Sequence, residues 1–294
     1  MEKAVYHLPG LFEFYDFYRE FLPIYREKTE YFYDWCQIGS LYGAPADCLW
    51  AGGRVSTGNA DPRQVLALTE EYGLSGRLTF SNSLLRPEHL KDPKCNRLCA
   101  LFGAESGNGV IVHSELLLDY LKEKYPNFYF VSSTTKVLTD FEDLAAETER
   151  PDFRYVVPDF RLNKAFDRLA GLKEKRKVEF LCNECCWPGC RERKECYENV
   201  SRKNLGEHCP DHICAAPEGE KGYRFSAAMK NPAFIGIRDI RETYLPMGFS
   251  QFKIEGRGLG SAMLLEFILY YLTKPEYQLL LREEMYLDSM LDLF

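Results

Sequence analysis

Seven of the eleven cysteines in the chain are concentrated in one short segment, and thiolates at such spacing can hold a metal ion or a metal cluster. Three residues separate Cys186 from Cys190 across a Trp-Pro-Gly turn, and four separate Cys209 from Cys214. Four thiolates suit either tetrahedral zinc or a 4Fe-4S cluster. The irregular spacing favours the iron-sulfur cluster, with zinc as the alternative. The seven cysteines are Cys182, Cys185, Cys186, Cys190, Cys196, Cys209 and Cys214.

The cellular compartment decides how such a cluster of thiols is interpreted. The N-terminal residues lack the charged start and apolar stretch of a secretory signal, and no run of about 18 apolar residues occurs. We therefore expect a cytoplasmic protein without a membrane segment. In a reducing cytosol, a metal site is a better interpretation of clustered cysteines than a disulfide-rich secreted insert.

Charged residues alternate near the end of the chain in a way that suggests a catalytic site. Lys253, Glu255 and Arg257 share one face of a predicted strand, and charges directed into a protein interior are costly unless they are paired or bind a ligand. Together with Arg54 and Lys136 they would hold a carboxylate or phosphate, with Glu255 as acid or base. The alternative is a structural ion network. We find no arrangement typical of serine or zinc peptidases.

The elements that must position these residues follow an alternating strand and helix pattern. Eight such units indicate an α/β fold, a (β/α)8 TIM-like barrel with a cysteine-rich insertion after the seventh strand. A doubly wound sheet is the alternative, but no G-x-G-x-x-G follows the first strand. The predicted strands are Ala4–Leu8, Cys48–Gly52, Arg77–Ser81, Gly109–His113, Phe128–Ser132, Phe153–Pro158, Val178–Cys182 and Phe249–Ile254.

The pattern predicts one barrel over residues 1–275, with the metal-binding insertion at 182–230. An amphipathic helical tail at 276–294 would close the barrel base or bury itself in a second subunit, giving a homodimer. The predicted helices cover 11–29, 62–72, 93–103, 114–124, 139–149, 163–170, 232–245 and 259–271.

Active sites of barrels lie at the C-terminal ends of the strands, and the predicted strand ends here are polar. The candidate substrate-binding residues at these ends are Arg54, Asn82, Lys136, Asn183 and Glu184. The net charge of −7 argues against a broad nucleic-acid footprint, because phosphate binding requires a basic surplus. A small molecule or a macromolecule undergoing modification is the expected substrate.

Two segments resemble a known family. Residues 180–193, FLCNECCWPGCRER, and residues 252–257, FKIEGR, are similar to signatures of the collagenase-like U-32 peptidases, in which a strand ending in Asn-Glu leads into C-x3-C-x2-R. The resemblance implies a TIM-like barrel that binds one oxygen-sensitive 4Fe-4S cluster through four cysteines. Several members act in oxygen-independent hydroxylation of ubiquinone precursors or RNA bases.

Carried over residue by residue, the resemblance implies Cys186 and Cys190 as the first ligand pair and Cys209 and Cys214 as the second, with Cys182 or Cys196 as substitutes. It implies an anaerobic redox enzyme, with an electron donor as a possible partner. The long C-terminal β extensions of larger members have no counterpart here. A non-catalytic scaffold, or a redox or sulfur-handling protein with a structural cluster or zinc, is the alternative.

Overall fold

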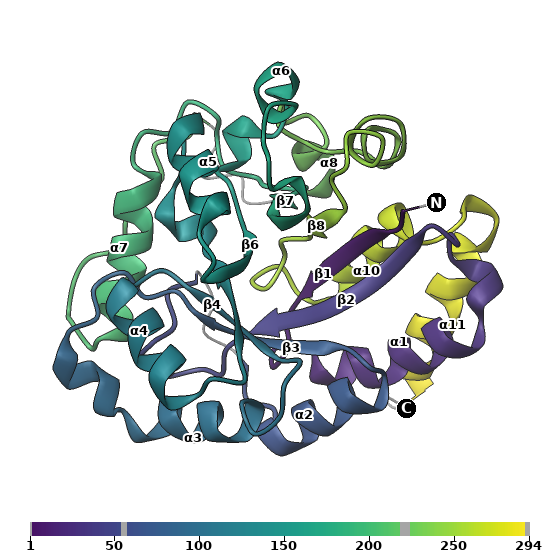
Figure 1. Cartoon of the computed structure of the whole chain (residues 1–294). Helices are drawn as coiled ribbons and strands as arrows, with labels where there is room; N and C mark the ends of the chain where they lie inside the picture. The colour runs from purple at the N-terminus through teal and green to yellow at the C-terminus, as the bar shows by residue number, and fades with distance from the viewer. Residues whose placement is uncertain (1, 54–57, 218–223, 292–294) are drawn as a thin grey trace.

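The computed structural model describes residues 2–53, 58–217 and 224–291. Its centre is a sheet of eight parallel strands in the order β6-β5-β4-β3-β2-β1-β8-β7 (Figure 1). A bridge between Val156 and Val178 links the two outer strands, so that the sheet forms a nearly closed barrel. The strands are β1 Ala4–Pro9, β2 Cys36–Gly43, β3 Ser75–Phe80, β4 Gly109–Val112, β5 Tyr129–Ser132, β6 Phe153–Val156, β7 Glu179–Leu181 and β8 Gln251–Lys253.

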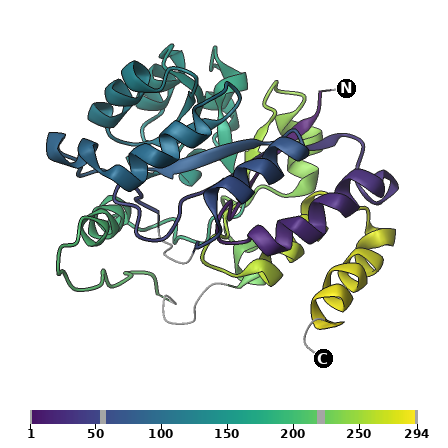
Figure 2. The ribbon, with the colours of Figure 1, turned by 90° about the horizontal axis from the view of Figure 1, so that it is seen from below.

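Helices cover the outside of this barrel, as the predicted (β/α)8 architecture requires. Figure 2 shows the last of them lying beside the first at the outer edge of the molecule. They are α1 Tyr15–Glu27, α2 Pro62–Glu71, α3 Pro93–Phe102, α4 Glu115–Lys124, α5 Phe141–Glu149, α6 Phe166–Leu169, α7 Arg193–Asn204, α8 Phe225–Ala228, α9 Ile237–Asp239, α10 Ser261–Tyr271 and α11 Gln278–Leu291.

Successive side chains of each strand point alternately outward and inward, which gives one core between the barrel and the helices and another inside the barrel. Phe180 on β7 and Phe252 on β8 face the helices and pack there with Tyr244. Their neighbours Glu179 and Lys253 instead reach each other inside the barrel. A small apolar layer also fills the interior, so the barrel is packed rather than open. Its members are Tyr42, Ile111, Val131, Val157 and Leu181.

Side-chain caps fix where four of the helices begin. Asp61, Asp92 and Asp140 accept backbone N–H bonds at 2.7 Å in the first turns of α2, α3 and α5, and Ser114 caps α4. Each cap satisfies a donor that the helix itself cannot, and such a cap is worth about 1 kcal/mol. The starts of these helices lie within two residues of the predicted ones.

The predicted second strand is wrong. The residues of Cys48–Gly52 form a loop, and β2 lies earlier in the chain. The loop is buried because Trp50 packs edge-on against Phe80 and donates a hydrogen bond to the His89 carbonyl oxygen. An apolar run therefore indicated burial correctly but not an extended conformation. The glycines of β2 weakened its signal, yet Gly39 is required because a Cβ there would lie 2.4 Å from Val5.

The segments around the seventh and eighth strands also differ from prediction. The insertion contains α7, which the sequence did not reveal, and the helix predicted over 232–245 is reduced to α9 followed by a π-helical turn, Ile240–Tyr244. The predicted tail forms α11, which buries Leu281 and Met285 against the barrel and leaves Leu279 exposed. Among the described residues, no helix is long and apolar enough to span a membrane.

Candidate functional site

A cavity of about 260 Å³ opens at the C-terminal ends of the strands, where the barrel fold predicts a site. Three of the predicted residues of β8 and its loop, Lys253, Glu255 and Arg257, line it together with Glu184 from the end of β7. Hydroxyl side chains from β3 and the loop after β5 form the opposite lining, and Tyr42, Ile111, Leu181 and Tyr197 supply apolar surface. These hydroxyl residues are Thr79, Ser81, Ser133, Thr134 and Thr135.

A buried ion network lies inside the barrel at the lysine end of the cavity. Glu179, which is fully buried, accepts a 2.6 Å bond from Arg77 and lies 3.3 Å from Lys253 Nζ and 3.5 Å from His7 Nε2. Burial opposes its ionised form, but the Arg77 and Lys253 cations outweigh this and hold the pKa of Glu179 well below its usual range. The charged carboxylate therefore anchors the interior.

His7 contributes no charge to this network. Burial and the neighbouring Arg77 guanidinium lower the pKa of His7 to about 3, although Glu179 opposes the shift. Its ring is held instead by Ser40 at 2.8 Å and Gln251 at 3.0 Å. With His7 neutral, two cations, Arg77 and Lys253, face one carboxylate, so the interior carries one surplus positive charge.

Glu184 and Glu255 lie close to Cys185 in the lining of the cavity. Ligand atoms of Glu184, Cys185 and Glu255 all lie within 4.8 Å of one another. The Glu184 carboxylate accepts from the amides of Cys185 and Cys186 at 3.0 Å and from the buried Arg193 at 2.5 Å. Its charge is thus already compensated, and the cluster suits proton transfer and polar binding better than a divalent cation.

Further ion pairs fix the rim. Arg257 donates to Glu13 Oε1 at 2.7 Å, which ties the loop after β8 to the loop after β1. Arg193, on the first turn of α7, also approaches Asp159 at 3.4 Å, and Arg161 binds Asp159 at 2.6 Å and the Cys190 carbonyl oxygen at 2.8 Å. The insertion is therefore attached to the barrel through buried charges at its beginning.

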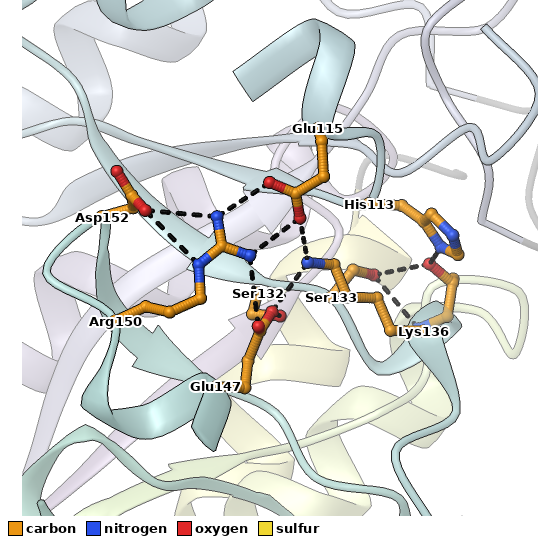
Figure 3. Close-up of polar contacts among 9 residues, drawn as sticks. His113, Glu115, Ser132, Ser133, Lys136, Glu147, Arg150 and Asp152 are labelled. Atoms are coloured by element: carbon orange, nitrogen blue, oxygen red, sulfur yellow. Dashed lines mark hydrogen bonds and ion pairs between the residues drawn. The ribbon is translucent and has the colours of Figure 1, made fainter. Parts of the chain in front are cut away.

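Two predicted substrate-binding residues have other partners. Lys136 pairs with Glu147 at 2.7 Å and Glu115 at 2.9 Å in the network that Figure 3 shows, where Arg150 binds the same two carboxylates. Asn82 donates to the carbonyl oxygens of Leu49 and Ser201, and so connects β3 to α7. Neither lines the cavity, and Arg54 lies outside the described residues.

A second set of hydrogen bonds in Figure 3 lies at the cavity wall. His113 Nδ1 lies 2.9 Å from Thr135 Oγ1, which donates to Ser133 Oγ at 3.0 Å. Burial, with Lys136 nearby, lowers the pKa of His113 to about 4, so the ring is neutral near pH 7. The neutral imidazole orients two hydroxyl groups that line the cavity.

The four predicted ligands lie along the insertion. Cys190 is buried, Cys186 and Cys209 are partly buried, and Cys214 is exposed. A tetrahedral zinc would hold its sulfurs roughly 3.8 Å apart, yet within the described residues no three of these thiols lie inside 4.8 Å. The set of four thiols matches the donor chemistry of either zinc or an iron-sulfur cluster.

Sequence reasoning did not identify the partners of the cavity residues. Lys253 pairs with Glu179, which also binds Arg77. Arg257 pairs with Glu13, and all these partners come from distant parts of the chain. A usable signal existed for two of them, because Arg77 and Glu179 are the single charged residues of β3 and β7. Glu13 lies in the loop after β1, and its sequence context carried no comparable signal.

Comparisons with known proteins address the fold. No family model matches the sequence, and no curated protein is significantly similar to it. Solved structures do match: one is a U32 peptidase that is 14% identical, with a TM-score of 0.54 over 88% of this chain and 94% of that one. At this identity the similarity concerns architecture. The chain therefore has the barrel fold of a U32 peptidase, in agreement with the two segments that resemble this family.

Proposed function

We propose that the protein is an iron-sulfur enzyme that acts on a small anionic substrate in the cavity at the strand ends. The observation that carries this proposal is the position of Cys185, which lines the cavity within 4.8 Å of Glu184 and Glu255. The cysteine-rich insertion thus begins at the wall of the cavity. Thiol chemistry and substrate binding would then share one location.

The charge of the interior supports an anionic substrate. Arg77 and Lys253 together exceed the single charge of Glu179, and Lys253 lines the cavity. In a site of low polarity a surplus charge is poorly solvated, so an anion that approaches Lys253 is favoured. Arg257 lies on the same lining and adds a second donor, although Glu13 shares its charge.

Cys186, Cys190, Cys209 and Cys214 would hold the cluster, which when bound supplies one-electron transfer. The residues of the chain provide the other functions. Lys253 would bind and orient the substrate, and Glu255 would donate or accept a proton at the substrate. A cytoplasmic location and an external electron donor belong to the same proposal.

A non-catalytic role in redox sensing or sulfur handling is the second candidate. It is favoured by the exposure of Cys185 and Cys214, since accessible thiols are the ones that react with external partners. For the enzyme, a macromolecule that undergoes modification is an alternative substrate, because the cavity opens to the surface.

Anaerobic purification followed by iron, zinc and acid-labile sulfide analysis tests the cofactor. We expect about four irons and four sulfides per chain, and loss of both in single Ser variants of the four proposed ligands. Cys36→Ser is the matched control, because Cys36 is a buried thiol at the start of β2, far along the chain from the insertion. Stoichiometric zinc without sulfide would contradict the iron-sulfur enzyme.

A further inference from the structure

Lys253 occupies an unusual place for a lysine. Its side chain is only 5% exposed, yet the residue lines the cavity from the end of β8. The ring centroid of Tyr42 lies 3.7 Å from Nζ, and the Tyr42 hydroxyl donates to the Ile254 carbonyl oxygen at 2.6 Å. The backbone of Ile254, the residue after β8, thus holds the Tyr42 ring in place, and this ring fixes the position of the ammonium group.

The charged groups around Nζ come from four elements. Glu179 on β7 attracts the ammonium, whereas Arg77 on β3 and Arg257 after β8 repel it, and His7 on β1 is neutral. The Glu179 carboxylate also pairs with Arg77. Its contact with Arg77 is 2.6 Å, which is shorter than the 3.3 Å contact with Lys253. The arrangement thus leaves Lys253 incompletely compensated.

An incompletely compensated lysine in a buried site can lose its proton. Burial is the largest effect and, with the repulsion by Arg77, it outweighs the attraction of Glu179, so that the pKa of Lys253 falls to about 8. A lysine shifted in this way carries an appreciable fraction of neutral amine near physiological pH. Neutral amines are the nucleophiles that attack carbonyl compounds.

We infer that Lys253 forms an imine with the carbonyl group of a small oxo acid bound in the cavity. The inference rests on the proposed function for the anionic character of the substrate and adds the reacting group. It follows from the enclosed position of Nζ, from the cavity beside it, and from the surplus positive charge that a carboxylate would balance.

The opposite lining suits the oxygen atoms of such a substrate. The hydroxyl oxygens of Thr79, Ser81 and Thr134 are buried, and they have no hydrogen-bond partner in the described part of the protein. All three residues line the cavity. Because buried hydroxyl groups without partners are costly, a ligand rich in hydrogen-bonding oxygens would be stabilised there.

The reaction balances without any further reagent. The neutral Nζ attacks the carbonyl carbon, a C–N bond forms, and the carbonyl π electrons move to oxygen, giving a carbinolamine after proton transfer from nitrogen to oxygen. Protonation of that hydroxyl group and loss of water give the protonated imine. In total, the ammonium form of Lys253 and the oxo acid yield the iminium and one water molecule. Glu255, on the same lining, can supply the proton that leaves with the water.

Reductive trapping tests the inference. Wild-type protein is incubated with pyruvate or glyoxylate and cyanoborohydride, and the modified lysine is located by peptide mass mapping. We expect the secondary amine at Lys253 in preference to surface lysines, with a yield that rises with pH around a midpoint near 8. Lys253→Arg should abolish trapping at this position, whereas Lys164→Arg, which alters a more exposed lysine paired with Asp239, should leave it unchanged.

The wild-type map is decisive even if the Lys253 variant fails to fold. Modification spread over surface lysines, without enrichment at Lys253, would overturn the imine.

Calorimetry with lactate, which lacks the carbonyl group, distinguishes failure of the imine from failure of the anion site. Lactate binding without trapping of pyruvate overturns the imine and leaves the anion site intact. Absence of both trapping and binding overturns the imine and the anionic substrate together.

Discussion

Asn183 and Glu255 continue the pairing of β7 with β8 beyond the point where the strands end. The Glu255 amide donates to Asn183 Oδ1 at 2.7 Å, and Asn183 Nδ2 donates to the Glu255 carbonyl oxygen at 2.9 Å. The last ladder pair joins Leu181 to Lys253, so the side-chain amide occupies the place of the next backbone pair. This fixes the backbone of Glu255 at the edge of the cavity.

Replacement of Asn183 by Ala should therefore displace Glu255. Two backbone groups lose their partners, and we expect a loss of about 1–3 kcal/mol in the free energy of unfolding, measured by urea denaturation. Asn127→Ala is the control, because Asn127 also donates to two carbonyl oxygens but at an exposed loop. Equal losses in the two variants would contradict a special role for the Asn183 pair.

Glu179→Gln should destabilise the protein strongly. It leaves Arg77 and Lys253 buried without their common carboxylate, and breaking a buried pair in this way costs about 3–5 kcal/mol. The control is Glu266→Gln, which breaks a partly exposed pair with Arg282 and should cost at most about 1 kcal/mol. Thermal unfolding of both variants measures the contrast. A small effect at Glu179 would mean that the interior tolerates its surplus charge.

Seven of the eight strands could be placed from the sequence because apolar runs and helix caps recur along it. Residues such as Asp61 and Ser114 determine helix starts locally. The second strand could not be found in this way. Its residues pack against partners at distant positions, as Gly39 does against Val5, whereas Trp50 fills a core position from a loop.

The site was predictable to the same extent. Strand alternation predicted Lys253, Glu255 and Arg257 on one lining, and all three line the cavity, although β8 ends at Lys253 and the other two lie in the loop that follows. The pairing of Lys136 with Glu147 and of Arg257 with Glu13 depends on which helices and loops lie beside each strand end. The local sequence pattern does not show which helices and loops pack beside a strand end. Lys253, which lines the cavity, and Lys136, which forms ion pairs outside it, therefore could not be distinguished from the sequence.

Stability should fall on mild acidification because of two neutral histidines. The folded-state pKa values of His7 and His113, about 3 and about 4, lie below the unfolded value near 6.5. Only the unfolded chain then binds these protons, so the stabilisation is complete above pH 6.5 and is lost as the pH falls below it. Each residue contributes a slope of at most about 1.4 kcal/mol per pH unit.

Urea titrations between pH 7 and 5 measure this slope, above the range in which carboxylates dominate. We expect His113→Gln to show a smaller slope than wild type, since one of the two groups is removed. A slope that does not change in His113→Gln, with the variant folded by circular dichroism, would show that this imidazole titrates alike in the folded and unfolded states.

Thr79→Val should separate stability from ligand binding. The Thr79 hydroxyl is buried without a partner in the described part of the chain, so removing it relieves a desolvation cost, and the free energy of unfolding should stay constant or rise by about 1 kcal/mol. Thr69→Val is the matched control. Its hydroxyl is also buried but donates to the Leu66 carbonyl oxygen at 2.8 Å, so the same change should lower stability by about 1 kcal/mol.

Lactate or pyruvate affinity should fall in Thr79→Val alone, because Thr79 lines the cavity and Thr69 lies on the outer helix α2. Destabilisation by Thr79→Val to the extent seen for Thr69→Val would show that the hydroxyl has a structural partner and does not serve the substrate.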